Sequence, residues 1–248
     1  AVSALSFSTN NGSEAMRITS SGNVGIGETV PLAKLHVKSG DSGVTPNGNA
    51  DDLFIENNGA AGITIGSSTN EKGNIFFADS GNALDGYIQY AHDTRYLRFA
   101  TATLERMRID SSGNVLVGKT SANTATAGVE FRSFGLGAFT RSGNQPIIAN
   151  RTSNDGIILE LQKDGTTVGS IGIESAGFYI DGEALHTGLI FTSNSVSPRD
   201  NGSATNNSTD LGNSAGTWKD LYLGGNAIIS GGAYLGGTGT ANKLDDYE

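Results

Sequence analysis

Two stretches of the chain carry nearly the same sequence, and this repeat limits the possible fold more than any other feature. Residues 14–27 read Glu-Ala-Met-Arg-Ile-Thr-Ser-Ser-Gly-Asn-Val-Gly-Ile-Gly, and residues 105–118 read Glu-Arg-Met-Arg-Ile-Asp-Ser-Ser-Gly-Asn-Val-Leu-Val-Gly. Each copy predicts a β-strand, a Ser-Ser-Gly-Asn turn and a second β-strand. A repeated hairpin favours an object built by repetition over a single catalytic pocket.

The rest of the chain predicts an all-β meander. Short apolar runs rich in β-branched and aromatic residues alternate with turns of Gly, Asn, Asp and Ser. The runs are Leu53–Ile55, Gly62–Gly66, Asn74–Phe77, Tyr87–Tyr90, Tyr96–Phe99 and Gly156–Leu161. A tight hairpin turn is expected at Asp164-Gly165. Only residues 30–37 and 103–108 have a helical pattern, and both are too short for a globular helix.

Low hydrophobicity indicates that one copy does not fold alone. Apolar residues make up 36% of the chain, against roughly 45–50% in soluble domains. Such a chain buries too little apolar surface to offset the entropy lost on ordering. We therefore infer an obligate oligomer in which several copies share one axial core.

Charge and cysteine content exclude several classes of protein. The net charge of −9 argues against nucleic acid and anionic lipid as partners, because phosphate binding needs a basic surface. The chain has no cysteine, which excludes disulfides, zinc ribbons and thiol catalysis. No apolar run approaches the roughly 20 residues needed to cross a bilayer. The chain begins without Met and almost inside the first repeat, so we expect a fragment or a processed product.

Composition divides the chain into four segments. Residues 1–40 hold the first repeat, and residues 41–120 begin with a polar loop and end with the second repeat. Residues 121–190 form a β-hairpin segment, and residues 191–248 form a C-terminal segment rich in Gly, Asn and Ser.

Residues with catalytic or metal-binding chemistry are present, but not in the patterns that such sites need. The three histidines have no zinc-binding spacing, and His92-Asp93 is interpreted as a surface pair beside a turn. Asp51-Asp52 and Asp245-Asp246 are assigned to solvated loops, because neighbours on a strand point to opposite faces. Residues 79–90 lack the ligand spacing of a calcium loop. We predict no enzyme, no cofactor and no metal.

Aromatic residues provide the one candidate binding feature. Tyr87, Tyr90 and Tyr96 cluster in the sequence near His92 and two arginines, and sugar rings stack on exposed tyrosines. These three tyrosines are our predicted glycan contacts. A second group is Trp218 with Tyr222. The alternative, that all of these are half-buried strand residues, stays open.

Several motifs, taken in order, resemble the distal tail-fibre proteins of tailed bacteriophages, a group often followed by a self-cleaving intramolecular chaperone. The motifs are Met-Arg-Ile-x-Ser-Ser-Gly-Asn-Val at 16–24 and 107–115, Asn-Arg-Thr-Ser-Asn-Asp-Gly at 150–156, Lys-Asp-Gly-Thr-Thr-Val-Gly-Ser-Ile-Gly at 163–172, Asp-Leu-Gly at 210–212 with Trp-Lys-Asp-Leu-Tyr-Leu at 218–223, and Tyr-Leu-Gly-Gly-Thr-Gly-Thr-Ala-Asn-Lys-Leu-Asp-Asp-Tyr-Glu at 234–248. The Ser-Asp-x-Arg-Leu-Lys signature of that chaperone is missing, so no residue here is assigned to autocleavage.

The resemblance implies an elongated, intertwined homotrimeric fibre, built of triple-stranded β-helix or β-prism modules joined by β-hairpins. It implies a structural protein of the virion, extracellular and located in the tail fibre, that takes part in attachment to the host. The implied partners are two further copies of the chain, other tail proteins and a host-surface receptor, either a glycan or a protein. Neither nucleic acid nor membrane insertion is expected.

In such a trimer we expect Met16 with Ile18, and Met107 with Ile109, to point inward, because residues two apart share a face of a strand. Arg17 and Arg108 are then expected to face water or a carboxylate of a neighbouring chain. Two alternatives remain at this point: a tailspike that depolymerises polysaccharide, and a fragment of a bacterial trimeric adhesin.

Overall fold

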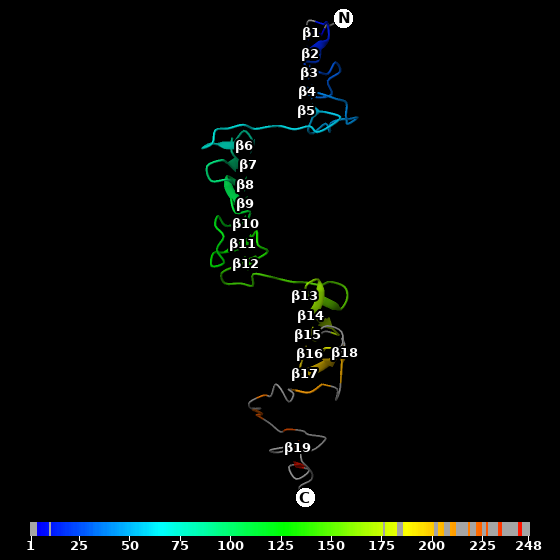
Figure 1. The fold of residues 1–248 in the computed structure, drawn as a ribbon, viewed down its shortest axis with the longest axis vertical. Coiled ribbons are helices and arrows are strands. Elements are labelled where there is room, and N and C mark those ends of the chain that lie inside the picture. Colours follow the sequence, from blue (N-terminus) through cyan, green and yellow to red (C-terminus); the bar gives the residue numbers. More distant parts are fainter. Residues whose placement is uncertain are drawn as a thin grey trace. The chain divides into compact units, whose positions relative to one another are not determined.

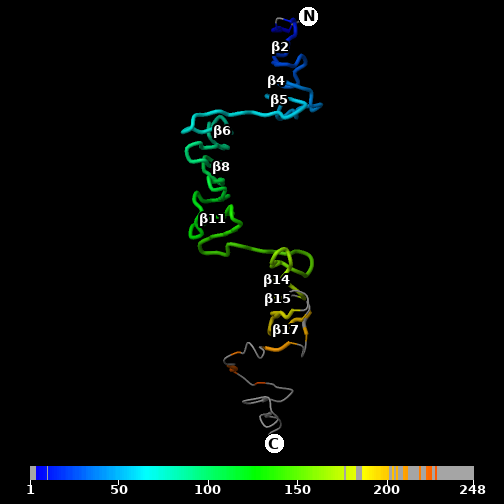
Figure 2. The backbone as a smooth tube through the Cα atoms, in the orientation of Figure 1, coloured from blue at the N-terminus to red at the C-terminus, as the bar shows by residue number. Residues whose placement is uncertain are grey.

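A computed structural model describes residues 4–9, 11–175, 177–182, 186–200, 203–205, 209–211, 218, 222–224, 227, 233–234 and 243–244. All regular structure in these ranges is β-strand, which confirms the predicted all-β class (Figures 1 and 2). Residues 30–37 and 103–108 form no helical turn and instead contribute to strands. No helix in the described ranges has the length and hydrophobicity to cross a membrane.

The first sheet has five strands in chain order. They are β1 (Leu5–Ser8), β2 (Glu14–Ile18), β3 (Val24–Ile26), β4 (Leu35–Lys38) and β5 (Leu53–Glu56). Strands β1 to β3 are antiparallel, as a meander requires. The pairs β3–β4 and β4–β5 are parallel, so the predicted meander is wrong here. The chain returns to the same end of the sheet through residues 27–34 and 39–52 before each of these strands begins.

The second sheet is an antiparallel meander of seven strands. They are β6 (Lys72–Phe77), β7 (Gly86–Ala91), β8 (Tyr96–Thr101), β9 (Leu104–Ile109), β10 (Val115–Val117), β11 (Gly128–Phe131) and β12 (Gly137–Thr140). Between the first and second sheets lie residues 57–71. The strand predicted at Gly62–Gly66 does not form a ladder with any described residue of the chain, and the segment is exposed.

The third sheet is also antiparallel. Its strands are β13 (Gly156–Lys163), β14 (Thr166–Glu174), β15 (Gly177–Gly182), β16 (Thr187–Phe191), β17 (Val196–Asp200) and β18 (Ser203–Ala204). Asp164 and Gly165 join β13 to β14 with φ angles of 52° and 79°, the two-residue hairpin turn expected from the sequence. A separate strand pair joins β19 (Ala233–Tyr234) to β20 (Lys243–Leu244).

The four compositional segments do not coincide with the sheets. The boundary after residue 40 falls between β4 and β5, that after residue 120 between β10 and β11, and that after residue 190 within β16. By internal contacts the chain divides into two compact units, residues 1–146 and residues 147–248.

The two copies of the repeat have the same backbone structure. In each copy the residue after the glutamate, Ala15 or Arg106, forms a β-bulge against the preceding strand. The bulged carbonyl accepts a hydrogen bond from the amide of the glycine that ends the copy, at 2.9 Å in both cases. In each turn a glycine adopts positive φ, at 82° for Gly22 and 81° for Gly113.

The bulge also explains why each copy starts with glutamate. It rotates Glu14 and Glu105 to the side of the sheet that carries the arginine three residues later. Arg17 therefore binds Glu14, and Arg108 binds Glu105, with Nε–Oε1 distances of 2.5 Å in both pairs. Our expectation for the arginines is wrong on this point: each pairs with a carboxylate of its own chain.

Each of the three sheets is a single layer. Among the described residues, extensive contacts between strands occur only between hydrogen-bonded neighbours. A sheet normally buries its apolar face against a second layer. Here no second sheet or helix in the described part of the chain covers it.

Candidate functional site

The first sheet carries two rows of apolar side chains on one face. The rows run across all five strands: Leu5, Ile18, Val24, Leu35 and Leu53 in one, and Phe7, Met16, Ile26, Val37 and Ile55 in the other. Each residue is paired with the next across neighbouring strands, so the rows are continuous. Phe7 is 51% exposed and Leu53 is 49% exposed, although both are large and apolar.

The second sheet repeats this arrangement over seven strands. One row consists of Ile75, Ile88, Phe99, Met107, Val117, Val129 and Phe139. A second row contains Tyr90, Leu97, Ile109, Val115 and Phe131. Met107 and Ile109 thus share a face with every apolar residue of both rows, as residues two apart on a strand should.

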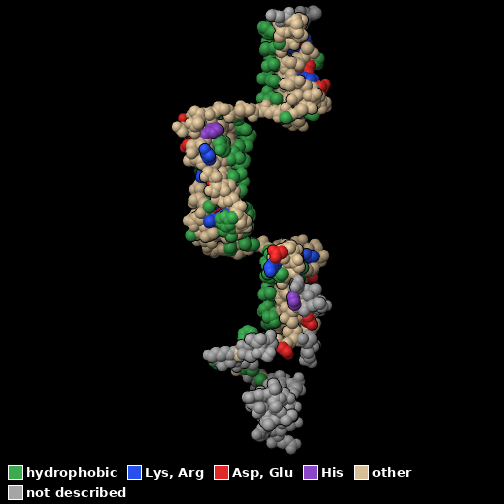
Figure 3. All heavy atoms as spheres, in the orientation of Figure 1, with side chains coloured by type: hydrophobic (Ala, Val, Ile, Leu, Met, Phe, Trp, Pro, Cys, Tyr) green, Lys and Arg blue, Asp and Glu red, His purple; other side chains and the backbone are tan. Residues whose placement is uncertain are grey.

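The third sheet has the same feature. One row holds Leu159, Ile171, Ile180, Leu189 and Pro198, and the next holds Ile173, Phe178, Phe191 and Val196. Figure 3 shows hydrophobic side chains gathered in a band along each of the three sheets. We call these three surfaces the apolar faces. Exposed apolar area of this extent marks an interaction surface.

The opposite face of the first and second sheets is mainly polar and covered by the chain's own loops, and the opposite face of the third sheet buries Ser170, Asp181 and Arg199. On the second sheet a row of paired residues there reads Asn74, Gln89, Arg98, Arg108, Leu116, Glu130 and Ala138. Leu116 and Glu130 are fully buried. The loop before β11 covers them, since the Asn123 amide donates to Glu130 Oε2 at 2.8 Å. We call these surfaces the covered faces.

Buried charges on the covered faces are neutralised within the chain. Lys119 Nζ lies 3.0 Å from Glu130 Oε2, and Arg132 Nη2 lies 2.8 Å from Glu130 Oε1. On the third sheet Arg199 binds Asp181, with Nε 3.1 Å from Oδ2, and also binds Glu174. Buried charges are tolerated when they are paired and hydrogen-bonded in this way.

The covered face of the first sheet holds a cluster of four ionisable groups that sequence analysis missed. His36 is fully buried, and its Nε2 lies 2.9 Å from Glu56 Oε2. The Leu32 amide donates to His36 Nδ1 at 3.4 Å, which leaves Nε2 to carry the hydrogen and donate it to Glu56. Lys38 Nζ lies 2.8 Å from Glu28 Oε2 and 3.5 Å from Glu56 Oε2.

This cluster has the composition of a metal site, but the positive charge among its carboxylates comes from a lysine side chain. Glu28, His36 and Glu56 offer ligand atoms within 4.8 Å of one another. The Lys38 ammonium lies among the same carboxylates and offsets part of their negative charge. Burial by itself raises the pKa of Glu56. Hydrogen bonds from the Ser42 amide and hydroxyl and from His36, together with the charge of Lys38, have the opposite and larger effect, so the pKa of Glu56 is lowered to about 2. The cluster therefore stabilises the fold of the first sheet.

The structure separates the three predicted glycan-contact tyrosines. Tyr87 and Tyr96 lie on the covered face, where the Arg98 guanidinium stands 5.0 Å and 5.8 Å from their ring centroids. The Arg108 guanidinium lies 4.2 Å from the Tyr96 ring. Tyr90 lies on the apolar face, edge-on to His92 at 5.0 Å. Glycan contact by these tyrosines stays a prediction, although they do not form one binding platform.

The acidic candidates have structural roles in the described ranges. The main-chain carbonyls of Asp51 and Asp52 accept hydrogen bonds from Lys34 and Leu35. Asp79 Oδ1 accepts from the amides of Gly81 and Asn82, both at 2.8 Å, so its carboxylate holds a turn. Asp245-Asp246 lies outside the described residues. Trp218 and Tyr222 are both exposed.

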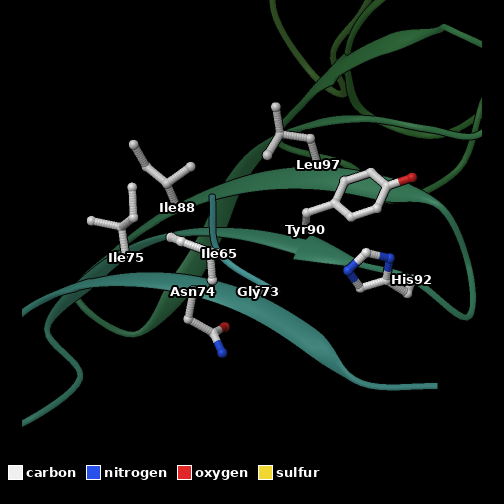
Figure 4. Close-up of a pocket in the computed structure, with 8 residues that line it drawn as sticks. All are labelled: Ile65, Gly73, Asn74, Ile75, Ile88, Tyr90, His92 and Leu97. Atoms are coloured by element: carbon white, nitrogen blue, oxygen red, sulfur yellow. The ribbon is translucent and has the colours of Figure 1, made fainter. Parts of the chain in front are cut away.

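A small hollow lies at the start of the second sheet, on its apolar face. It measures about 230 Å³ and is lined mainly by apolar side chains, with Tyr90 and His92 at one end (Figure 4). Ile65, from the segment between the first two sheets, lies among Ile75, Ile88 and Tyr90. This segment therefore reaches the apolar face with a side chain of its own.

Comparison with known proteins gives no relative. No protein-family model, curated protein or solved structure matches the chain.

Proposed function

We propose that this chain is a non-enzymatic structural segment of a homotrimeric tail fibre of a tailed bacteriophage, and that it takes part in attachment to the host surface. One observation supports this assembly above the others: all three sheets expose a continuous apolar face, and their buried charged groups lie on the opposite face. A sheet that is covered on its polar side and bare on its apolar side is suited to association through the bare side.

Copies of the same chain are the partner that fits these faces best. The rows are uniformly apolar in all three sheets. Copies placed face to face therefore pack the apolar side chains of one chain against the apolar side chains of another. A shared interior also supplies the apolar burial that one chain lacks. The number of copies, three, and the role in host attachment rest on the sequence resemblance to tail fibres.

Sedimentation equilibrium tests the assembly. We expect a particle of three times the 25.5 kDa chain mass that keeps this mass at elevated temperature and in mild detergent. A stable single chain contradicts the proposal, and a particle of two chains contradicts its stoichiometry.

A glycan array tests attachment. The assembled protein should bind a defined set of surface glycans, and a variant that sediments as a single chain should lose this binding, because attachment then depends on the assembly. Cleavage of any arrayed polysaccharide contradicts the non-enzymatic assignment.

A further inference from the structure

Residues 61–67, between the first and second sheets, form an extended segment with unpaired backbone. Among the described residues, none of their amides or carbonyls takes part in a backbone hydrogen bond, and all seven residues are exposed. Their sequence, Ala-Gly-Ile-Thr-Ile-Gly-Ser, has the β-branched alternation of a strand. The segment thus has the side chains of a strand but lacks a partner strand.

The two isoleucines of this segment lie against apolar faces. Ile63 lines a hollow with Leu53 and Ile55 of the first sheet. Ile65 lines the hollow on the second sheet, and its Cγ2 is 3.5 Å from where a Cβ on Gly73 would lie. Even so, Ile63 stays 68% exposed and Ile65 47% exposed. The chain's own sheets therefore provide only part of their packing.

Both apolar faces become buried in the assembly proposed above, and this inference rests on that assembly. The segment between residues 61 and 67 would then be enclosed together with its isoleucines. Main-chain amides and carbonyls that are removed from water are almost always hydrogen-bonded, since leaving them unpaired is costly. The described part of the same chain supplies no such partner for this segment.

We propose that residues 62–66 form an interchain β-strand, hydrogen-bonded through its backbone to another copy of this chain. Free edges for pairing are present nearby, because β5 and β6 are the terminal strands of their sheets. Ile63 and Ile65, two residues apart, then continue the apolar faces between the first two sheets. Thr64 points to the opposite side of the strand.

Amide hydrogen exchange on the assembled full chain tests this proposal. We expect alternate amides within residues 63–66, those that point to the partner strand, to exchange about 100-fold more slowly than those of Thr45, Asn47 and Gly48, which lie in an exposed loop and donate no backbone hydrogen bond to any described residue. The protection should disappear in a variant that sediments as a single chain. Equal exchange in the two segments, or protection that persists in the single chain, overturns the proposal.

A matched pair of variants gives a second measurement. Ile63→Asn should lower the Tm of the assembly by about 5 °C or more, because it places an amide in the shared core. Thr64→Asn, one position along on the opposite side, should leave the Tm nearly unchanged. Equal effects of the two substitutions contradict the strand orientation.

The two proposals can fail separately. If the wild-type chain sediments as a trimer and its 63–66 amides still exchange fast, only the interchain strand is wrong and the fibre proposal stands.

Discussion

Glu56 shows how a charged residue is retained inside a chain with few apolar residues. Its carboxylate is almost completely buried, and it accepts hydrogen bonds from the Ser42 amide and hydroxyl at 2.7 Å and 2.8 Å and from His36 at 2.9 Å. The partners come from β4 and from the loop between β4 and β5. A single side chain therefore joins two strands and the loop that covers them.

We expect this cluster to make the first sheet sensitive to acid. The pKa of Glu56 is lowered from 4.5 to about 2 in the folded protein. A lowered pKa contributes stability that is fully present above pH 4.5 and is lost as the pH falls toward 2. Thermal unfolding between pH 6 and pH 2 should show a decline in Tm across this window that is smaller in Glu56→Gln. Glu71→Gln, at an exposed position, is the control, and a Glu56→Gln profile as steep as that of the control contradicts the assignment.

At the scale of elements, the repeated hairpin is the part that sequence reasoning describes best. Thr19 and Asp110 occupy equivalent turn positions, and in both copies a side-chain oxygen accepts from the asparagine amide four residues later, at 3.0 Å and 2.9 Å. The same turn thus forms with a hydroxyl in one copy and a carboxylate in the other. Both can cap the turn, which is why the substitution between the copies is tolerated.

The turn glycines give a prediction that compares the two copies directly. Gly22→Ala and Gly113→Ala should each destabilise the protein by about 1 kcal/mol, because both glycines have φ near 80°, which a residue with a Cβ adopts only with strain. Neither added methyl group would clash: nothing lies within 4 Å at Gly22, and Ser133 Cβ is at an ordinary contact distance of 3.6 Å at Gly113. Gly48→Ala, in open space and without positive φ, is the control and should have little effect. Denaturant unfolding measures all three. A large difference between the two turn variants would show that the copies are not equivalent.

Elements that depend on distant residues were not predictable in the same way. The parallel pairs β3–β4 and β4–β5 depend on where the loops 27–34 and 39–52 return the chain, and no local pattern encodes this. His36 and Glu56 lie 20 residues apart, so their contact was not visible either. The tyrosines lie on different faces because side chains alternate between the two faces along a strand. Tyr87 and Tyr90, three residues apart on β7, must therefore lie on opposite faces.

For the whole molecule, the arrangement of faces matters more than any single cluster. Each sheet buries its charged groups on one side and leaves its apolar side exposed. A sheet in an isolated globular domain has the reverse pattern, because its apolar side packs on the core and its polar side faces water. The arrangement in this chain also accounts for the low apolar content, because the interior of one chain is built largely from paired polar groups.

Charge placed on each apolar face in turn tests which sheets take part in assembly. We expect Ile26→Asp, Val117→Asp and Leu189→Asp, one for each sheet, to weaken association by about 100-fold or more, since each buries an unpaired carboxylate between copies. The matched controls Ser20→Asp, Ser111→Asp and Ser193→Asp add the same charge at exposed turns of the same sheets and should leave the mass unchanged. Sedimentation over a range of concentrations measures the shift. If all six variants keep the wild-type mass, the apolar faces do not hold the copies together; if one face variant alone dissociates, association is confined to that sheet.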